Sequence, residues 1–203
     1  TPGFIRIPYN DIPALEKALE DPHVAGFLVE PIQGEAGVYV PDEGYLRKAF
    51  ELCKAHKVLF MADEVQTGIA RTGKLLACDH EGVRPDVLIL GKALGGGMMP
   101  VSCVLADDEI MLCIRPGEHG STFGGNPIAA KVSIAALEVV RDEKLAENAE
   151  NLGKITLPSE SEGIFASWCG KLNRQPKSDI FQKSPLNKVK TQDNDNIKEL
   201  MLE

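Results

Sequence analysis

The sequence predicts an α/β protein with a mostly parallel sheet flanked by helices. Short apolar runs alternate with amphipathic segments of helical period along residues 1–153. The runs are apolar on both faces instead of alternating with polar residues, as is typical of parallel strands covered by helices. With 203 residues, 43% of them hydrophobic, the chain is long enough to bury the core of one domain.

The first two expected elements are a helix and a strand. The segment "DIPALEKALED" (11–21) has apolar residues at helical spacing after an aspartate and an early proline, which is typical of a helix start. The segment "GFLVE" (26–30) is a short apolar run that ends in Glu30, and it predicts a buried strand.

The same alternation continues along the chain. The amphipathic segment "GYLRKAFELCKAHK" (44–57) predicts a second helix. Further strands are expected in "VLFMADE" (58–64), "DVLILGK" (86–92) and "VSCVLAD" (101–107). A long helix is then expected from about Asn126, a good N-cap, to Gly153, a residue type that often ends helices.

Residues 154–203 differ in composition from the rest of the chain. Stretches such as "NRQPKSD" and "KTQDNDN" have low hydrophobicity and no sustained period. We therefore expect residues 154–203 to form a divergent, poorly ordered tail outside the fold of residues 1–153.

The net charge and the composition of the chain argue against several classes of binding partner. The net charge of 22 − 30 = −8 argues against nucleic acid or an anionic membrane surface as the main partner. No apolar run approaches the length that a bilayer requires, and no signal-peptide pattern opens the chain. The five cysteines lack CxxC spacing, so we expect no metal site and a packing role for each.

Ionisable residues follow three of the expected strands: Glu30, Asp63 and Lys92. Ligands of open parallel sheets bind outside the carboxyl ends of the strands, so these side chains are expected at one rim. Lys92 is either a strand-end lysine with its ammonium in water or an amine held in a cleft to form a Schiff base with a carbonyl.

Two further features are compatible with pyridoxal phosphate. Asp63 is costly to bury without a cation, and a protonated pyridine nitrogen would supply one in a charge-assisted hydrogen bond of about 1.5–3 kcal/mol. Its alternative role is to cap a nearby helix. Ser121 and Thr122 lie in a glycine-rich loop that offers hydroxyls and amides to an anion, or that forms an ordinary turn.

Five segments together resemble the class III pyridoxal-phosphate-dependent aminotransferases. They are "PGFIRIPYND", "VEPIQGEAGV", "ADEVQTGIARTG", "LGKALGGGMMPVS" and "PGEHGSTFGGNP", in this order. The ornithine-specific members resemble the chain most, while acetylornithine and 4-aminobutyrate aminotransferases share the framework. The resemblance implies that residues 1–153 are the central part of the pyridoxal-phosphate-binding large domain of a fold-type I transferase.

The resemblance also implies a role for each matching residue. Lys92 would hold the cofactor as a Schiff base and move a proton, and Asp63 would pair with the pyridine nitrogen. Val65 would pack on the ring, and Gln66 would hydrogen-bond its phenolic oxygen.

The remaining implied roles concern the phosphate and the substrate. Ser121 and Thr122 would bind the cofactor's phosphate across the interface of a homodimer or larger oligomer. Glu35 would pair with an arginine that handles substrate carboxylates, and Glu30 is assigned to the same substrate site. From the residues alone, both glutamates are expected to be solvated loop acids.

The implied reaction moves the terminal amino group of ornithine to 2-oxoglutarate, giving glutamate-5-semialdehyde and glutamate. In many eukaryotes the family members of this type are mitochondrial matrix enzymes, while the bacterial ones are cytoplasmic. The resemblance therefore implies the mitochondrial matrix if the source is eukaryotic and the cytoplasm otherwise. Relatives have a long segment before position 1 and a small C-terminal domain that carries the arginine. We therefore expect a fragment, which is either part of such an enzyme or catalytically silent.

Overall fold

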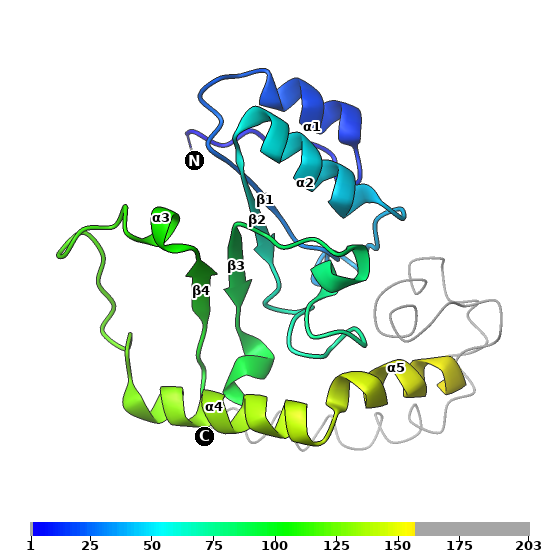
Figure 1. Cartoon of the computed structure of the whole chain (residues 1–203), viewed down its shortest axis with the longest axis vertical. Coiled ribbons are helices and arrows are strands. Elements are labelled where there is room, and N and C mark those ends of the chain that lie inside the picture. The colour runs from blue at the N-terminus through cyan, green and yellow to red at the C-terminus, as the bar shows by residue number, and fades with distance from the viewer. Residues whose placement is uncertain (1, 157–203) are drawn as a thin grey trace, which may run out of the picture.

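The computed structural model describes residues 2–156, which form a four-stranded sheet with the order β1-β2-β3-β4 (Figure 1). The strands β1 (Gly26–Val29), β2 (Leu59–Asp63) and β3 (Val87–Leu90) are parallel. The last strand, β4 (Cys103–Ala106), runs antiparallel to β3. The predicted α/β class with a mostly parallel sheet is confirmed.

Two helices pack on one face of the sheet. Helix α1 (Ile12–Leu19) begins where the side chain of Asp11 accepts a hydrogen bond from the N–H of Ala14 at 2.9 Å. Helix α2 (Tyr45–His56) ends at Lys57, which adopts the left-handed conformation (φ +57°). Helix α2 packs on β2, and α1 packs on α2.

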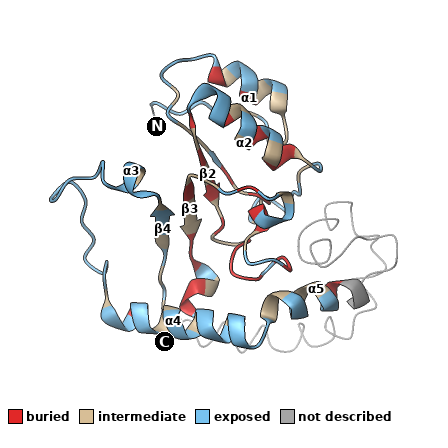
Figure 2. Cartoon of the chain, viewed as in Figure 1, coloured by how far each residue is buried: buried red, intermediate tan, exposed pale blue. Residues whose placement is uncertain are grey.

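The main core lies between these helices and the sheet, as the buried residues in Figure 2 show. The strand register places Phe27 opposite Phe60 and Val29 opposite Ala62, so these side chains share the face that meets α2. Phe60 is fully buried, and its ring meets that of Phe50 edge to face at 5.8 Å. This face therefore has the tight packing of an interior.

The opposite face of the sheet is only partly covered. Leu28 of β1 and Val104 of β4 point to this face and are 54% and 48% exposed. Strand β4 is also an edge of the described sheet. The apolar strands thus present a face that the described helices do not fully bury.

Two 3₁₀ turns and a short helix complete the strand region. The turn η1 (Ala77–Glu81) precedes β3, and η2 (Lys92–Gly95) follows it. The short helix α3 (Asp108–Met111) follows β4. Helix α4 (Pro127–Asp142) packs on η2 at the carboxyl end of β3 (Figure 1).

The expected long helix from Asn126 to Gly153 is wrong, because the segment forms two helices. Asn126 caps α4 as predicted, accepting hydrogen bonds from the N–H groups of Ile128 (2.8 Å) and Ala129 (3.3 Å). Helix α4 ends before Lys144, whose φ of +51° is left-handed, and α5 (Leu145–Thr156) follows. The helical spacing of the apolar residues continues through Lys144, so the sequence pattern does not reveal that α4 and α5 are separate helices.

The cysteine prediction is confirmed only in part. Cys53 and Cys78 are fully buried, whereas Cys113 is exposed and has no packing role. Cys103 is partly buried, and Cys169 lies outside the described residues.

The expected tail of residues 154–203 lies outside the described residues except at its start. Residues 154–156 continue α5, beyond the Gly153 stop that the sequence predicts. Among residues 2–156, no helix has the length and apolarity needed to span a bilayer. No His, Cys, Asp or Glu side chains in the same part of the chain gather into a metal-binding group.

Candidate active site

The carboxyl ends of the parallel strands meet at one edge of the sheet. Asp63 is the last residue of β2 and pairs in register with Ile89 of β3. Lys92 follows β3 after Gly91, and Glu30 follows β1. The structure therefore places Asp63 at the carboxyl end of β2 and Lys92 just beyond the carboxyl end of the neighbouring β3, on the same side of the sheet's ends, as the sequence predicts.

Lys92 stands at the start of η2 in a left-handed backbone conformation, with φ of +41°. Non-glycine residues avoid this region, at a cost of about 1–2 kcal/mol, and such strain concentrates at functional sites. The lysine side chain is 54% exposed. The preceding Gly91 fits closely, because a Cβ there would lie 3.2 Å from Cγ1 of Val65.

Three of the predicted residues meet in a polar cluster, which we call the Glu35 cluster: Glu35, Gln66 and Lys92. Oε1 of Glu35 accepts hydrogen bonds from Nε2 of Gln66 at 2.8 Å and from Nζ of Lys92 at 3.5 Å. Glu35 is 87% exposed, so its ion pair with Lys92 is screened by water and is worth less than about 1 kcal/mol. The pair orients Lys92 only weakly, and its amine is free to exchange partners.

A tight turn brings Glu35 to Gln66. The turn is closed by backbone hydrogen bonds between Gln33 and Tyr39, at 3.0 and 2.9 Å. Gly34 lets the Gln66 amide lie close to this turn, because a Cβ at residue 34 would lie 2.3 Å from Oε1 of Gln66 and would shift that side chain. The missing side chain at residue 34 thus makes room for the Gln66 amide.

Asp63 is half-buried, and its Oδ1 accepts a hydrogen bond from the N–H of Val65 at 3.1 Å. Among the described residues Asp63 caps no helix, which was the alternative role, and this contact closes a turn instead. Among the described residues, Oδ2 of Asp63 receives no hydrogen bond. One carboxylate oxygen is therefore available to a further donor.

Glu30 stabilises the neighbouring turn. Its Oε2 accepts a hydrogen bond from the N–H of Gly34 at 3.2 Å. The hydroxyl of Tyr9 donates to the carbonyls of Glu30 (3.2 Å) and Pro31 (2.9 Å). Glu30 thus fixes the segment that carries Glu35, and it does not join the Glu35 cluster.

Among the described residues, no hydrogen bond or ion pair joins Ser121 or Thr122 to Lys92. Both are exposed, in the segment between α3 and α4 that lies outside β4 (Figure 1). Oγ of Ser121 accepts a hydrogen bond from the N–H of Gly124 at 3.0 Å, which closes the glycine-rich loop. A role across a subunit interface requires a second chain and remains a prediction.

Sequence reasoning missed Glu64, which adjoins Asp63 and is only 1% exposed. Its carboxylate accepts hydrogen bonds from Oγ1 of Thr67 at 2.6 Å and from the N–H groups of Ala77 (2.9 Å) and Cys78 (2.8 Å). Burial, reinforced by the Glu64 carboxylate, raises the pKa of the Cys78 thiol. The one available signal was a second acid next to an apolar run.

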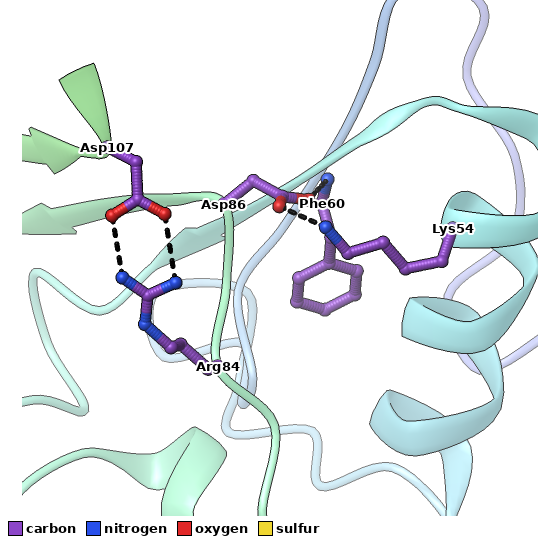
Figure 3. A network of polar contacts seen from close by, with 5 residues as sticks. All are labelled: Lys54, Phe60, Arg84, Asp86 and Asp107. Atoms are coloured by element: carbon purple, nitrogen blue, oxygen red, sulfur yellow. Dashed lines mark hydrogen bonds and ion pairs between the residues drawn. The ribbon is translucent and has the colours of Figure 1, made fainter. Parts of the chain in front are cut away.

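A separate polar network lies at the amino ends of β2 and β3, away from Lys92 (Figure 3). Asp86 accepts a hydrogen bond from the N–H of Phe60 at 2.9 Å and forms an ion pair with Lys54. Arg84 binds Asp107 through two hydrogen bonds of 3.0 and 2.7 Å. The hydrogen bonds and charge of Arg84 lower the pKa of the Asp107 carboxyl.

Comparison with known proteins gives consistent matches to one family. The family model for class III aminotransferases matches residues 2–159. The mitochondrial ornithine aminotransferase of Rattus norvegicus is 68% identical over 154 residues, which is 76% of this chain and 35% of the rat protein.

Solved structures agree in fold. The ornithine aminotransferase of Toxoplasma gondii, described as having partial occupancy of PLP at its active site, has a TM-score of 0.75 and 57% identity. The alignment covers 76% of this chain and 36% of that one. The acetylornithine aminotransferase of Elizabethkingia anophelis has a TM-score of 0.75 and 70% identity, over 76% of this chain and 39% of that one.

The matched region is only part of each relative, and the chain spans 35–42% of the length of the curated relatives compared. Within this region, the family model, the sequence identities and the fold agree. The predicted resemblance is confirmed, and the chain belongs to the class III aminotransferases.

Proposed function

We propose that this chain is the lysine-bearing part of a pyridoxal-phosphate-dependent aminotransferase. It would act on the terminal amino group of ornithine and transfer it to 2-oxoglutarate, giving glutamate-5-semialdehyde and glutamate. The observation that carries the proposal is the meeting of Lys92 with Gln66 and Glu35 beside the strand that ends in Asp63.

The chemistry of these residues fits pyridoxal phosphate. When bound, this cofactor supplies an aldehyde that combines with amines and an aromatic ring that accepts electrons. Lys92 offers a half-exposed amine to the aldehyde, and Oδ2 of Asp63 can accept a hydrogen bond from the ring nitrogen. Val65 offers an apolar side chain to the ring face, and Gln66 offers an amide to the ring oxygen.

Each side chain has a distinct task in this proposal. The amine of Lys92, once released, takes a proton from the carbon that bears the transferred amino group and later returns one. The charge of Asp63 keeps the ring nitrogen protonated. Glu35 exchanges its bonds to Gln66 and Lys92 for an arginine that handles substrate carboxylates, which its weak ion pair permits.

We further propose that Ser121 and Thr122 bind the cofactor's phosphate in a neighbouring subunit of a homodimer or larger oligomer. The exposure of both residues supports this arrangement, as does the absence, among the described residues, of a hydrogen bond from either to the Glu35 cluster. Glu30 contributes to the substrate site by fixing the turn that carries Glu35.

The cellular location is also a proposal. Relatives from Rattus norvegicus, Drosophila melanogaster and Caenorhabditis elegans are named as mitochondrial proteins. We propose the mitochondrial matrix if the source is eukaryotic and the cytoplasm otherwise.

Acetylornithine is a second candidate substrate. The 70% identity to the Elizabethkingia anophelis enzyme, named as an acetylornithine aminotransferase, favours it specifically. The Glu35 cluster and Asp63 are compatible with free and with acetylated ornithine. A 4-aminobutyrate-type enzyme and a catalytically silent fragment are the two further candidates.

Absorption spectroscopy of the purified chain with pyridoxal phosphate tests cofactor binding. We expect a visible band that Lys92→Ala abolishes, and borohydride reduction should attach the cofactor to Lys92 in peptide mass spectra. Attachment spread evenly over surface lysines would contradict the proposal. Turnover with ornithine against N-acetylornithine, each with 2-oxoglutarate, then separates the two substrates.

The same assay addresses the possibility of a silent fragment. We expect weak turnover, because the chain spans only 35–42% of the length of its curated relatives. Turnover close to that of a complete relative would show that residues 1–203 are sufficient.

A further inference from the structure

We propose that Glu64 is a positioning residue, which holds Asp63, Val65 and Gln66 in place beside Lys92. This inference rests on the proposed function of those residues. Glu64 lies between Asp63 and Val65 in the chain, yet its side chain is only 1% exposed and has no hydrogen bond to the Glu35 cluster among the described residues.

The carboxylate of Glu64 is held by uncharged donors. Oε2 accepts from Oγ1 of Thr67 (2.6 Å) and the N–H of Ala77 (2.9 Å), while Oε1 accepts from the N–H of Cys78 (2.8 Å). No ion pair reaches it from the described residues. A buried charge without a cation is expensive unless donors satisfy both oxygens, so these bonds fix its place.

Backbone hydrogen bonds also connect Glu64 to β3, the strand that precedes Lys92. Its N–H donates to the carbonyl of Ile89 in β3 at 2.9 Å, and its carbonyl accepts from the N–H of Gly68 at 2.9 Å. Glu64 therefore connects the end of β2, the turn with Val65 and Gln66, and the approach to Lys92.

The loop between Gly68 and Ala77 explains why an anchor is needed. Ile69 and Ala70 are both left-handed, with φ of +58° and +66°. Two successive non-glycine residues in this region, one of them β-branched, are strained, and such strain persists only where the surroundings fix the backbone. The bonds from Ala77 and Cys78 to Glu64 hold the far end of this loop against the turn.

The substitution Glu64→Gln isolates the role of the carboxylate. Glutamine has nearly the same shape but only one acceptor oxygen, so its NH₂ group would face a backbone N–H of Ala77 or Cys78. One buried donor is then left without a partner, which we expect to displace the turn.

Asp86→Asn is the matched control, because it makes the same chemical change on a carboxylate that also accepts a backbone N–H (Figure 3). Asp86 lies at the other end of the strands, so its loss lowers stability without moving Asp63 or Gln66. Two substitutions at Thr67 perturb the same site less. Thr67→Val removes the hydroxyl that donates to Glu64, and Thr67→Ser keeps it.

The measurement is reductive attachment of pyridoxal phosphate in the full chain, expressed as modification of Lys92 relative to the exposed Lys57. Peptide mass spectrometry gives this ratio, and urea unfolding gives the folded fraction for each variant. We expect Glu64→Gln to lower the ratio about tenfold, as loss of a buried hydrogen bond implies. Thr67→Val should lower it less, Thr67→Ser should restore it, and Asp86→Asn should keep it within about twofold of wild type.

The outcomes separate the two proposals. A wild-type chain without preference for Lys92 contradicts the proposed function and this inference together. A wild-type preference that Glu64→Gln retains overturns the inference alone. An equal fall in Glu64→Gln and Asp86→Asn also overturns it, because the effect would then follow stability. If Glu64→Gln does not fold, the two Thr67 variants decide the matter by the same ratio.

Discussion

Lys92 adopts a backbone conformation that glycine tolerates more easily than lysine, with φ of +41°. The sequence indicated a special lysine by its place between an apolar run and three glycines. It could not indicate the left-handed backbone, because that depends on the packing of η2 against α4. Lys92 thus combines a proposed chemical role with local backbone strain.

This strain predicts the relative stability of two variants that both lack the amine. Lys92→Gly should be more stable than Lys92→Ala, by up to about 1 kcal/mol, because only alanine carries a Cβ into the left-handed region. Urea unfolding measures the difference. At Lys48, which is exposed within α2, the same two substitutions should have the opposite order. Equal stability of the two Lys92 variants would contradict the strain.

The buried thiols predict a pH dependence. Burial chiefly raises the pKa of Cys53 to about 11, from 9.0. The unfolded chain therefore releases this proton at lower pH than the folded chain does. The contribution of the protonated Cys53 thiol to the free energy of unfolding is fully present below pH 9. It should be lost as the pH rises through about 11.

Urea unfolding from pH 8 to pH 11 measures this loss, and Cys53→Ala should flatten the profile. Iodoacetamide labelling at pH 8 provides a separate check, since exposed Cys113 should react in the folded chain and Cys53 only after unfolding. Rapid labelling of Cys53 in the folded chain would contradict its burial.

The resemblance to a family predicted the members of the Glu35 cluster better than their residue types alone did. Without that resemblance, Glu35 is expected to be a solvated loop acid, and its 87% exposure agrees with that expectation. Glu64 shows the converse, because two of its three donors, Ala77 and Cys78, lie 13 and 14 residues away and only the fold brings them close. Contacts of this kind are invisible to local patterns.

At the scale of elements, the strands and helix starts were the most predictable features. Each expected apolar run contains a strand, and Asp11 and Asn126 cap their helices through side-chain oxygens. These features follow from local interactions. A buried strand requires a run of apolar residues, and the unpaired N–H groups at a helix start favour a side chain that accepts hydrogen bonds. The antiparallel direction of β4 and the break after α4 depend on packing and were not predicted.

The break between α4 and α5 predicts a stabilising substitution. Lys144 ends α4 with φ of +51°, the conformation in which glycine commonly ends helices. Lys144→Gly should therefore raise the free energy of unfolding by a few tenths of a kcal/mol to about 1 kcal/mol. Thermal unfolding measures the change. Loss of stability on Lys144→Gly, as at a residue inside a continuous helix, would show that α4 and α5 are one helix.

At the scale of the whole molecule, the partly covered face of the sheet is the main departure from a self-contained domain. The chain spans 35–42% of its curated relatives, and Leu28 and Val104 remain about half exposed on this face. Strand β4 adds an open edge. Exposed apolar strands and open edges promote association between copies.

This surface predicts that the purified chain associates with itself at high concentration. Val104→Lys should raise the concentration at which light scattering increases, with little change in unfolding free energy, because the residue is 48% exposed. Ser102→Lys adds the same charge at an exposed polar position and is the control for net charge. Equal effects of the two substitutions would assign the association to charge and not to the apolar face.

Gly34 has a consequence for interpreting inherited or selected variants. A methyl group at this position would fall 2.3 Å from the side-chain oxygen of Gln66. Gly34→Ala is a mild replacement on any similarity scale, yet the added methyl group would shift the Gln66 amide away from its bond to Glu35. A substitution at Gly34 should therefore be interpreted as a displacement of the Gln66 amide, caused by the size of the new side chain.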